Sequence, residues 1–379
     1  MQQNNATSSA FLIEGSRDYC SASPPVLLQL LDLGIDKNSD LLLKLVRAAT
    51  RQRQVFCKSM AAAVVPVYVT SICNEDCQYC NFRRSNRSQH IERRQLSTVE
   101  LEGELTNLIC ERGYRAVELV YANDPKLSPS DIATHVAICR RVLDTVGGGV
   151  IGVNVHPMST DGYKRLVDAG LDFAVQWQET YNRNCYAAYH AAEGNKRDYD
   201  YRYNAYERML WAGIHHIGVG ILFGLAPWRE DFKALLRHET ELYRRFGIWP
   251  AILGTARLKP ARGAMIKHTE FVPNDEELVC AIAVHTLFAP HIVPWVSTRE
   301  SWDLCVKLAQ GGCLFTFDCS TTPGGYSHET KSYQFPTHDF PASVYSKEIE
   351  RHGLKTVFDW AFGHRGGLES SSSRTEAAR

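Results

Sequence analysis

The chain has 379 residues, of which 44% are hydrophobic and 22% are charged, a composition typical of a globular protein with a large core. Lys plus Arg and Asp plus Glu both number 42, and this zero net charge argues against nucleic acid or an anionic membrane as a partner. No apolar run reaches the ~18 residues that a membrane span needs. The N-terminus lacks the basic and apolar segments of a secretory signal, so we expect a cytoplasmic protein.

Short β-branched segments alternate with segments of helical periodicity along most of the chain. This alternation favours one parallel sheet with right-handed crossovers. Eight strands fit an α/β fold of the (β/α)8 TIM-barrel type, although an open doubly wound sheet would show the same alternation. The expected strands are 64–70, 116–121, 149–156, 172–177, 216–223, 249–257, 291–297 and 313–318. The expected helices are 97–113, 128–146, 160–170, 183–190, 199–212, 229–246, 275–288 and 299–310.

The remaining segments predict additions to the barrel. Residues 1–60 are expected to form a helical N-terminal extension, with helices at 25–35 and 38–55. The barrel itself is assigned to 61–320, and 321–365 is expected to pack against it. The Ser-rich, polar stretch 366–379 is typical of a disordered tail.

Three of the twelve cysteines, Cys73, Cys77 and Cys80, are clustered with the spacing C-x3-C-x2-C, directly after the first expected strand. Thiolates hold iron–sulfur clusters, and three thiolates around a [4Fe–4S] cubane leave one iron open. An open iron can bind the amine and carboxylate of S-adenosylmethionine (SAM), and an electron from the cluster then cleaves SAM to a 5′-deoxyadenosyl radical. The position supports this interpretation, because barrel enzymes carry their chemistry at the C-terminal ends of strands.

Other interpretations of the triplet need ligands that the spacing does not supply. Zinc usually takes four N or S ligands, and neither His90 nor Cys110 has the usual close spacing. A ferredoxin-like electron carrier needs a fourth cysteine. The other nine cysteines are too scattered for a disulfide framework, and buried, reduced thiols are the simplest interpretation for them.

Longer motifs follow one another along the chain: PVYVTSICNEDCQYCNFRRSN (66–86), WQETY (177–181), DYDYR (198–202), GVGILFGL (218–225), ARLKPA (256–261), STRES (297–301) and PGGY (323–326). They resemble the aromatic amino-acid lyases of the radical SAM superfamily, a family that includes tyrosine lyases and a tryptophan lyase. The resemblance covers most of residues 64–340. It implies a radical SAM carbon–carbon lyase that fragments a free aromatic amino acid, tyrosine (to 2-iminoacetate and p-cresol) or tryptophan. It also implies one [4Fe–4S] cluster, SAM, and an electron donor such as flavodoxin or ferredoxin.

Five polar residues are assigned by the resemblance to the SAM site. Tyr79 is expected to pack near the adenine, and Glu179 to hold a ribose hydroxyl or the SAM amine. Arg202 is expected to bind the SAM carboxylate, and Asn123 and Asn154 to face SAM from the ends of the second and third strands. The alternatives are a surface salt bridge for Glu179, a solvated helix arginine for Arg202 and loop capping for Asn154.

Four further residues are assigned to the amino-acid substrate. Tyr68 is expected to face the substrate amine. Arg257, at the end of the sixth strand, is expected to clamp the α-carboxylate through its planar guanidinium, unless it serves a structural ion pair. Ser297 and Arg299, at the end of the seventh strand, are expected to complete the anion site.

The sequence departs from the family pattern at two places. Ala122-Asn123 stands where the family has Gly-Glu, which removes a carboxylate near the SAM ammonium, and Asp124 is the nearest acid that could compensate. Lys259 replaces a second arginine, and the two are not interchangeable where a bidentate fork is needed. These departures keep two alternatives open: a different amino-acid substrate in cofactor or natural-product biosynthesis, or a non-catalytic Fe–S maturation scaffold.

Three further features bear on these alternatives. Segment 320–379 has no cysteine, so it lacks the C-terminal cysteine motif of the hydrogenase-maturation relatives. The basic segment 83–94, RRSNRSQHIERR, is either a solvated loop or a contact with an anionic substrate or partner. PGGY is most simply a turn that uses glycine conformational freedom.

Overall fold

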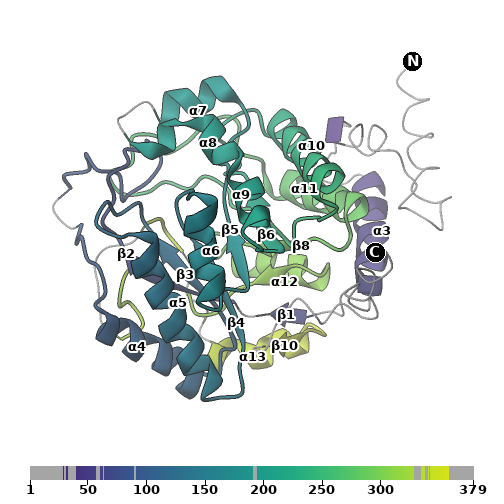
Figure 1. Cartoon of the computed structure of the whole chain (residues 1–379). Coiled ribbons are helices and arrows are strands. Elements are labelled where there is room, and N and C mark those ends of the chain that lie inside the picture. The colour runs from purple at the N-terminus through teal and green to yellow at the C-terminus, as the bar shows by residue number, and fades with distance from the viewer. Residues whose placement is uncertain are drawn as a thin grey trace, which may run out of the picture.

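Eight parallel strands form the centre of the molecule (Figure 1). The computed structural model describes residues 29, 31–32, 40–56, 60–62, 64–88, 91–190, 194–327, 334–337, 340 and 342–357. The strands pair in sequential order from β2 to β9, and all pairs are parallel. A doubly wound sheet would reverse its strand order, so the (β/α)8 prediction is confirmed. The strands are β2 Val65–Thr70, β3 Ala116–Tyr121, β4 Val150–Asn154, β5 Phe173–Val175, β6 His216–Gly220, β7 Ile252–Gly254, β8 Val293–Val296 and β9 Leu314–Phe315.

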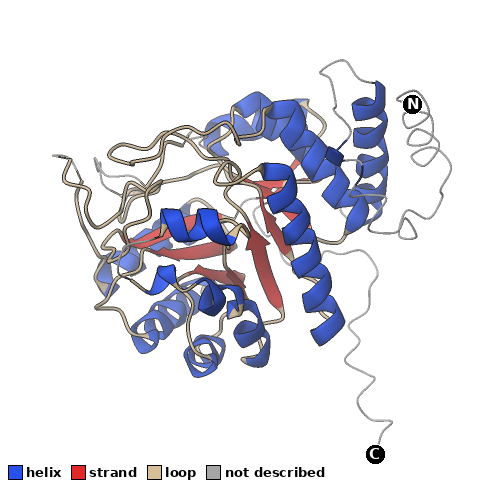
Figure 2. Ribbon diagram, turned by 90° about the horizontal axis from the view of Figure 1, so that it is seen from above, coloured by secondary structure: helices blue, strands red, loops and turns tan. Residues whose placement is uncertain are grey.

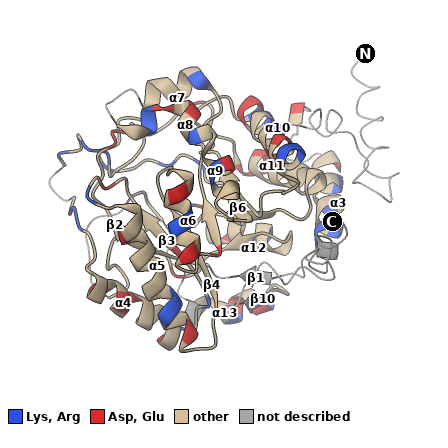
Figure 3. Ribbon diagram, in the orientation of Figure 1, with Lys and Arg blue, Asp and Glu red and all other residues tan. Residues whose placement is uncertain are grey.

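Helices cover the outside of this sheet, as the view from above shows (Figure 2). Positions of Lys or Arg and positions of Asp or Glu are interspersed along the ribbon of these helices (Figure 3), which agrees with the zero net charge. Within the described part of the chain, no helix combines the length and apolar character that crossing a bilayer requires. The barrel helices are α4 Thr98–Thr106, α5 Pro129–Asp144, α6 Thr160–Asp168, α7 Arg183–Tyr189, α8 Tyr199–Tyr203, α9 Ala205–Trp211, α10 Trp228–Phe246, α11 Asp275–Phe288 and α12 Trp302–Gln310, with short turns η2 Asn107–Glu111 and η3 Asn195–Arg197.

Local sequence determines where several of these helices begin and end. A capping box opens α4, where the Ser97 side chain accepts from the Glu100 amide and the Glu100 carboxylate accepts from the Ser97 amide in return. The expected helix 97–113 continues from α4 as a π-helical turn before Gly113, whose φ is 83°. The expected helix 199–212 was wrong as a single element. It is broken at Asn204, whose ψ of 7° lies outside the helical range, into α8 and α9.

Segments that precede and follow the barrel in the sequence close the end of the barrel at which the strands begin. Helix α3 (Asp40–Phe56) confirms the expected helix 38–55 and packs against α11. Its buried Arg53 donates to the carbonyls of Ile292 (2.6 Å) and Gly312 (3.2 Å), which precede β8 and β9. The parallel pair β1 (Met60–Ala62) and β10 (Lys355–Val357) and helix α13 (Ala342–Arg351) were not predicted. Most of the expected helix 25–35 and all of the tail 366–379 lie outside the described residues.

The barrel is curled but not closed by strand pairing, since β2 and β9 are the two ends of the sheet. Tyr326 of the PGGY motif spans this gap. Its hydroxyl donates to the carbonyl of Pro66 in β2 (2.7 Å) and accepts from the amide of Ser320 beyond β9 (3.1 Å). Tyr114 adds a second connection, because its hydroxyl donates to Asp318 (2.5 Å). PGGY therefore does more than form the expected turn.

Inward-facing side chains form two levels inside the barrel. The lower level is an apolar cluster that includes Ala116, Phe173, Ile252 and Leu314. Above it the indole of Trp177 lies across two glycines of neighbouring strands, Gly220 and Gly254. A Cβ on Gly254 would lie 2.4 Å from the Trp177 ring. The glycines therefore make the space that the large ring occupies.

This packing predicts that two glycine-to-alanine substitutions change the free energy of unfolding in opposite directions. Gly254→Ala should lower the free energy of unfolding by about 1–3 kcal/mol, the usual cost of overpacking, because the Trp177 indole must move. Gly103→Ala in α4 is the matched control, since nothing lies within 4 Å of a Cβ at that position. It should raise the free energy of unfolding by about 0.5–1 kcal/mol through helix propensity. Chemical denaturation measures both, and equal effects would contradict the packing argument.

Candidate active site

A cavity of about 250 Å³ lies at the C-terminal ends of the strands. Every site residue predicted from the sequence lines this cavity, except Arg257. They arrive from separate elements: the cluster loop, which we define as residues 71–82 after β2, the ends of β3, β4 and β8, the segment after β5, and α8. Parallel strands place their carboxyl ends together, and this explains why residues so far apart in sequence meet.

Backbone anchoring determines the shape of the cluster loop. Ser71 at its start donates its amide to the Arg94 carbonyl (2.8 Å). The Arg93 guanidinium then donates to the carbonyls of Ser71 (3.1 Å), Phe82 (2.6 Å) and Arg83 (2.8 Å). One arginine of the basic segment 83–94 thus ties the start of the loop to its end. Cys73, Cys77 and Cys80 are held between these two points and all face the cavity.

The chemistry of the three thiols fits an iron–sulfur cluster. Burial, together with the charge of a neighbouring cysteine, raises the pKa of each thiol to about 11. Three thiolates are therefore unfavourable here unless a cationic cluster compensates them. Backbone amides of Glu75 and Asn123 donate to Cys73, and that of Phe82 donates to Cys80, as sulfur ligands of clusters require.

The same arrangement does not suit a single metal ion. Within the described ranges, no three His, Cys, Asp or Glu side chains converge closely enough to hold one. A cubane spreads its ligands over separate irons, so this spacing is compatible with a cluster and counts against the zinc alternative.

Glu179 is the most strongly constrained residue of the SAM side. It is the one non-glycine residue with positive φ (73°) in the described part of the chain, and such strain is typical of functional sites. Its carboxylate accepts from Lys196 Nζ (2.6 Å) and lies 3.5 Å from Arg202. Burial opposes ionisation, but Lys196 and Arg202 outweigh it and hold the pKa of Glu179 at about 2. The surface salt-bridge alternative is thereby wrong, since Glu179 and Arg202 are buried in the cavity wall and Lys196 is partly buried beside them.

Arg202 and Tyr79 flank this carboxylate. Arg202 is buried rather than solvated, and it donates to the carbonyl of Trp177 (2.8 Å from Nε). The Tyr79 hydroxyl is hydrogen-bonded to His190 Nε2 (2.8 Å), which turns the ring into the cavity wall beside Lys196. Both side chains are therefore fixed before any ligand binds.

Asn123 lies beside a carboxylate that the sequence analysis overlooked. Its side-chain amide donates to Glu75 Oε1, which also accepts from the amide of Lys196 (3.1 Å). Gly194 packs so closely that a Cβ there would lie 2.1 Å from Glu75 Oε2. Asp124, considered above as the compensating acid, does not line the cavity. It accepts instead from the Thr70 hydroxyl (2.9 Å).

Tyr68, Ser297 and Arg299 face the cavity from the opposite side. The Tyr68 hydroxyl donates to Gln334 Oε1 (2.7 Å), and Gln334 Nε2 lies 3.8 Å from the sulfur of Cys80. The Arg299 guanidinium stacks on the Phe335 ring, 3.4 Å from its centroid. Burial lowers the pKa of Arg299, and its Nε has no hydrogen-bond partner among the described residues. Arg299 therefore has donors available for an anion.

Arg257 is occupied elsewhere. Its guanidinium pairs with Glu300 (3.0 Å from Nε), with Asp275 (2.7 Å) and with the carbonyl of Pro273 (2.9 Å). Lys259, the residue that replaces the second family arginine, lines the cavity and lies 3.4 Å from Glu300. The structural ion pair, weighed above as the alternative for Arg257, is the arrangement present.

Several cavity residues escaped sequence reasoning because their neighbours come from distant segments. Lys196 and Gln334 lie outside the strand ends, where the sequence predicts site residues. All six residues of β3 are buried, so the one acid within its apolar sequence AVELVY, Glu118, could have indicated an inward-facing carboxyl group. The burial of His156, together with Arg202, lowers its pKa to about 4.

Comparison with known proteins agrees with this geometry. Residues 67–238 match the model of the radical SAM superfamily. The chain is 31% identical over 323 residues to 2-iminoacetate synthase from Salmonella typhimurium, covering 83% of this chain and 81% of that protein. The Escherichia coli 2-iminoacetate synthase matches with the same identity and coverage.

Solved structures show the same fold. The FeFe-hydrogenase maturase HydG from Carboxydothermus hydrogenoformans superposes with a TM-score of 0.83 at 25% identity, covering 96% of this chain and 81% of that one. Methylornithine synthase (PylB) gives a TM-score of 0.70 at 20% identity, covering 92% of this chain and 97% of that one. The second likeness concerns the fold alone.

The Glu75–Asn123 contact leads to a prediction about SAM. If Glu75 supplies the carboxylate that position 123 lacks, Glu75→Gln should weaken SAM binding about 10- to 100-fold, the effect of losing one charge-assisted hydrogen bond. Glutamine can still accept from Asn123 and from the Lys196 amide, so the loop should keep its shape. Calorimetric titration of SAM into the cluster-loaded variants measures the affinity, and iron content checks the loop. Asp124→Asn is the control, and equal affinities in the two variants would contradict the assignment.

Proposed function

The chain belongs to the radical SAM family that includes 2-iminoacetate synthase, and from this we propose that its substrate is free tyrosine. It is a radical SAM lyase whose cofactors are a [4Fe–4S] cluster and SAM. The proposed reaction breaks the Cα–Cβ bond of tyrosine and gives 2-iminoacetate and p-cresol.

One observation carries this proposal: the cluster cysteines, the predicted SAM residues and Arg299 line one cavity above an aromatic floor. Nη1 of Arg299 donates to the Arg257 carbonyl (3.3 Å), but its Nε has no hydrogen-bond partner among the described residues. When bound, the cluster and SAM supply the radical that takes a hydrogen atom from the substrate, and one electron and one proton complete the cresol. Trp177 and Trp295, which line the same cavity, suit an aromatic side chain.

The residues of this chain orient the substrate. We assign the α-carboxylate to Arg299 and Ser297, in place of the Arg257 clamp expected from the resemblance, because the Arg257 donors are already paired. Tyr68 faces the substrate amine, and Gln334 fixes the Tyr68 hydroxyl next to Cys80. The buried walls exclude water, which protects a reactive radical from side reactions.

Product analysis tests the function directly. The reconstituted enzyme should hold about four iron per chain, as one cubane requires. With SAM, reductant and tyrosine it should release 5′-deoxyadenosine and p-cresol. Cys73→Ala, Cys77→Ala or Cys80→Ala should abolish SAM cleavage, whereas Cys139→Ala should not, since Cys139 is buried in α5 outside the cavity.

Mass spectrometry of the products separates the alternatives. Indolic products from tryptophan would replace tyrosine as the substrate, and cleavage of neither amino acid would sink the proposal. Absence of 5′-deoxyadenosine would favour the non-catalytic scaffold.

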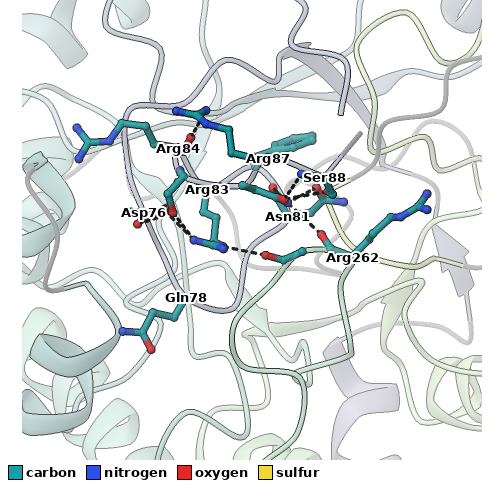
Figure 4. Close-up of polar contacts among 12 residues, drawn as sticks. Asp76, Gln78, Asn81, Arg83, Arg84, Arg87, Ser88 and Arg262 are labelled. Carbon is teal, nitrogen blue, oxygen red and sulfur yellow. Dashed lines mark hydrogen bonds and ion pairs between the residues drawn. The ribbon is translucent and has the colours of Figure 1, made fainter. Parts of the chain in front are cut away.

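The electron must enter from outside, and we propose that a flavodoxin or ferredoxin of the cytoplasm docks over the cluster loop. Arg84, Arg87 and Arg262 are exposed here, and no described acid pairs with them (Figure 4). Arg83 instead pairs with Asp76 and donates to the Gly263 carbonyl (2.8 Å), which joins the loop to segment 262–268. The chain as a whole is neutral, so this local excess of cations is compatible with an acidic partner.

Reversing these charges should affect the protein donor only. Arg84→Glu with Arg87→Glu should slow reduction by flavodoxin about tenfold or more at low salt, because electrostatic steering is lost. Dithionite needs no docking, so its reduction rate should not change. Arg165→Glu with Arg244→Glu alters two exposed arginines of α6 and α10 as the control. Stopped-flow bleaching of the cluster absorbance measures all rates, and equal slowing with both reductants would refute this docking surface.

A further inference from the structure

The cavity contains one buried acid that the chemistry proposed above does not use. Glu118 of β3 is 5% exposed and lines the cavity. The Asn154 side chain hydrogen-bonds to its carboxyl group. The other oxygen, Oε1, is shielded from solvent and has no hydrogen-bond partner among the described residues. A buried polar atom without a partner is costly, so its presence in a binding cavity points to a ligand group.

The strand register gives the depth of Glu118. Glu118 pairs with Pro66, whereas Val120 pairs with Tyr68. Two residues along a strand correspond to about 7 Å, so Glu118 lies that much farther from the cluster loop than the Tyr68 level does. An amino acid whose amine meets Tyr68 would direct the far end of its side chain towards Glu118.

The surroundings of Glu118 favour an uncharged, aromatic group. Among the cavity residues that belong to strands, Glu118 is the only carboxylate, and none is a Lys or Arg. Pro66, Trp295 and the Trp177 ring beside Gly254 supply apolar surface. An aromatic ring with one polar atom at its end matches this combination.

The protonation of Glu118 agrees with this choice. Burial raises the pKa of Glu118 to about 8, although the hydrogen bond from Asn154 opposes the rise. At neutral pH the side chain is therefore mostly a neutral carboxyl, which can donate as well as accept a hydrogen bond. It suits a neutral hydroxyl and gives no counter-charge to an ammonium group.

We propose that Glu118 hydrogen-bonds the phenol hydroxyl of the substrate and thereby selects tyrosine over phenylalanine. This inference rests on the proposed function and names the residue that determines its specificity. A site that leaves its own polar atom unpaired discriminates strongly against an analogue that lacks the partner group.

The test compares binding of tyrosine, phenylalanine and lysine to the cluster-loaded enzyme with SAM, measured by calorimetry, together with cresol release. Wild type should prefer tyrosine to phenylalanine. Glu118→Leu should lower this preference about 10- to 100-fold, the range expected for one buried hydrogen bond. Glu118→Gln, which can still donate and accept, should keep most of the preference. Glu104→Leu is the control, because Glu104 is a buried glutamate of α4 that does not line the cavity.

The outcomes are distinguishable. An unchanged preference in Glu118→Leu, with tyrosine still cleaved, overturns the role of Glu118 and leaves the proposed function intact. Lysine binding that Glu118→Leu abolishes shows that Glu118 is a counter-ion and overturns the phenol assignment. If wild type neither binds nor cleaves tyrosine, the proposed function itself fails, and the inference with it.

Discussion

The geometry of this site depends on how Arg93 closes the cluster loop. Three backbone carbonyls from both ends of the loop converge on one guanidinium. A cation that satisfies three carbonyls is a strong constraint, since each hydrogen bond is charge-assisted and a buried carbonyl left alone is costly. This constraint holds the three cysteine thiols close together. Without it, burial and the repulsion between neighbouring thiolates would favour protonated thiols that lie farther apart. The strand ends, SAM-side charges and substrate wall are arranged around this loop.

Charge is distributed unevenly across the cavity. The SAM side combines Glu75, Glu179, Lys196 and Arg202. Glu179 has Lys196 and Arg202 as opposite charges, whereas Glu75 accepts hydrogen bonds from the Asn123 side chain and the Lys196 backbone amide. The interior below it consists mainly of aromatic and small residues. A cofactor rich in charged groups and a substrate with an apolar side chain therefore meet two different environments in a single cavity. This division allows the polar half to hold its ligand without attracting water into the half where the radical reacts.

The sequence predicts those features of the fold and site that depend on residues close together in the chain. The spacing of the cysteines and the ends of the strands depend on residues near one another in the chain. The sheet order confirms the predicted barrel, and the residues predicted at its strand ends line one cavity, except Arg257. Prediction from the sequence was less successful wherever a distant partner decides the direction of a side chain. Arg257 does end a strand segment, but Glu300 and Asp275 turn it away from the cavity. Asp124 is the nearest acid in sequence to Asn123, yet Glu75, 48 positions away, is the acid that Asn123 contacts. The break at Asn204 separates two helices that periodicity alone joins.

The open edge between β2 and β9 has a consequence for how such an enzyme can change. Part of the substrate wall, Gln334 and Phe335, belongs to the segment beyond the sheet, which Tyr326 connects across the gap. Gln334 and Phe335 belong to no strand of the sheet, so substitutions at these two positions leave the pairing of the eight strands intact. The cofactor half is built from the sheet and tolerates little alteration. Part of the substrate wall can therefore be remodelled in evolution through one peripheral segment, while the radical-generating machinery is inherited unchanged.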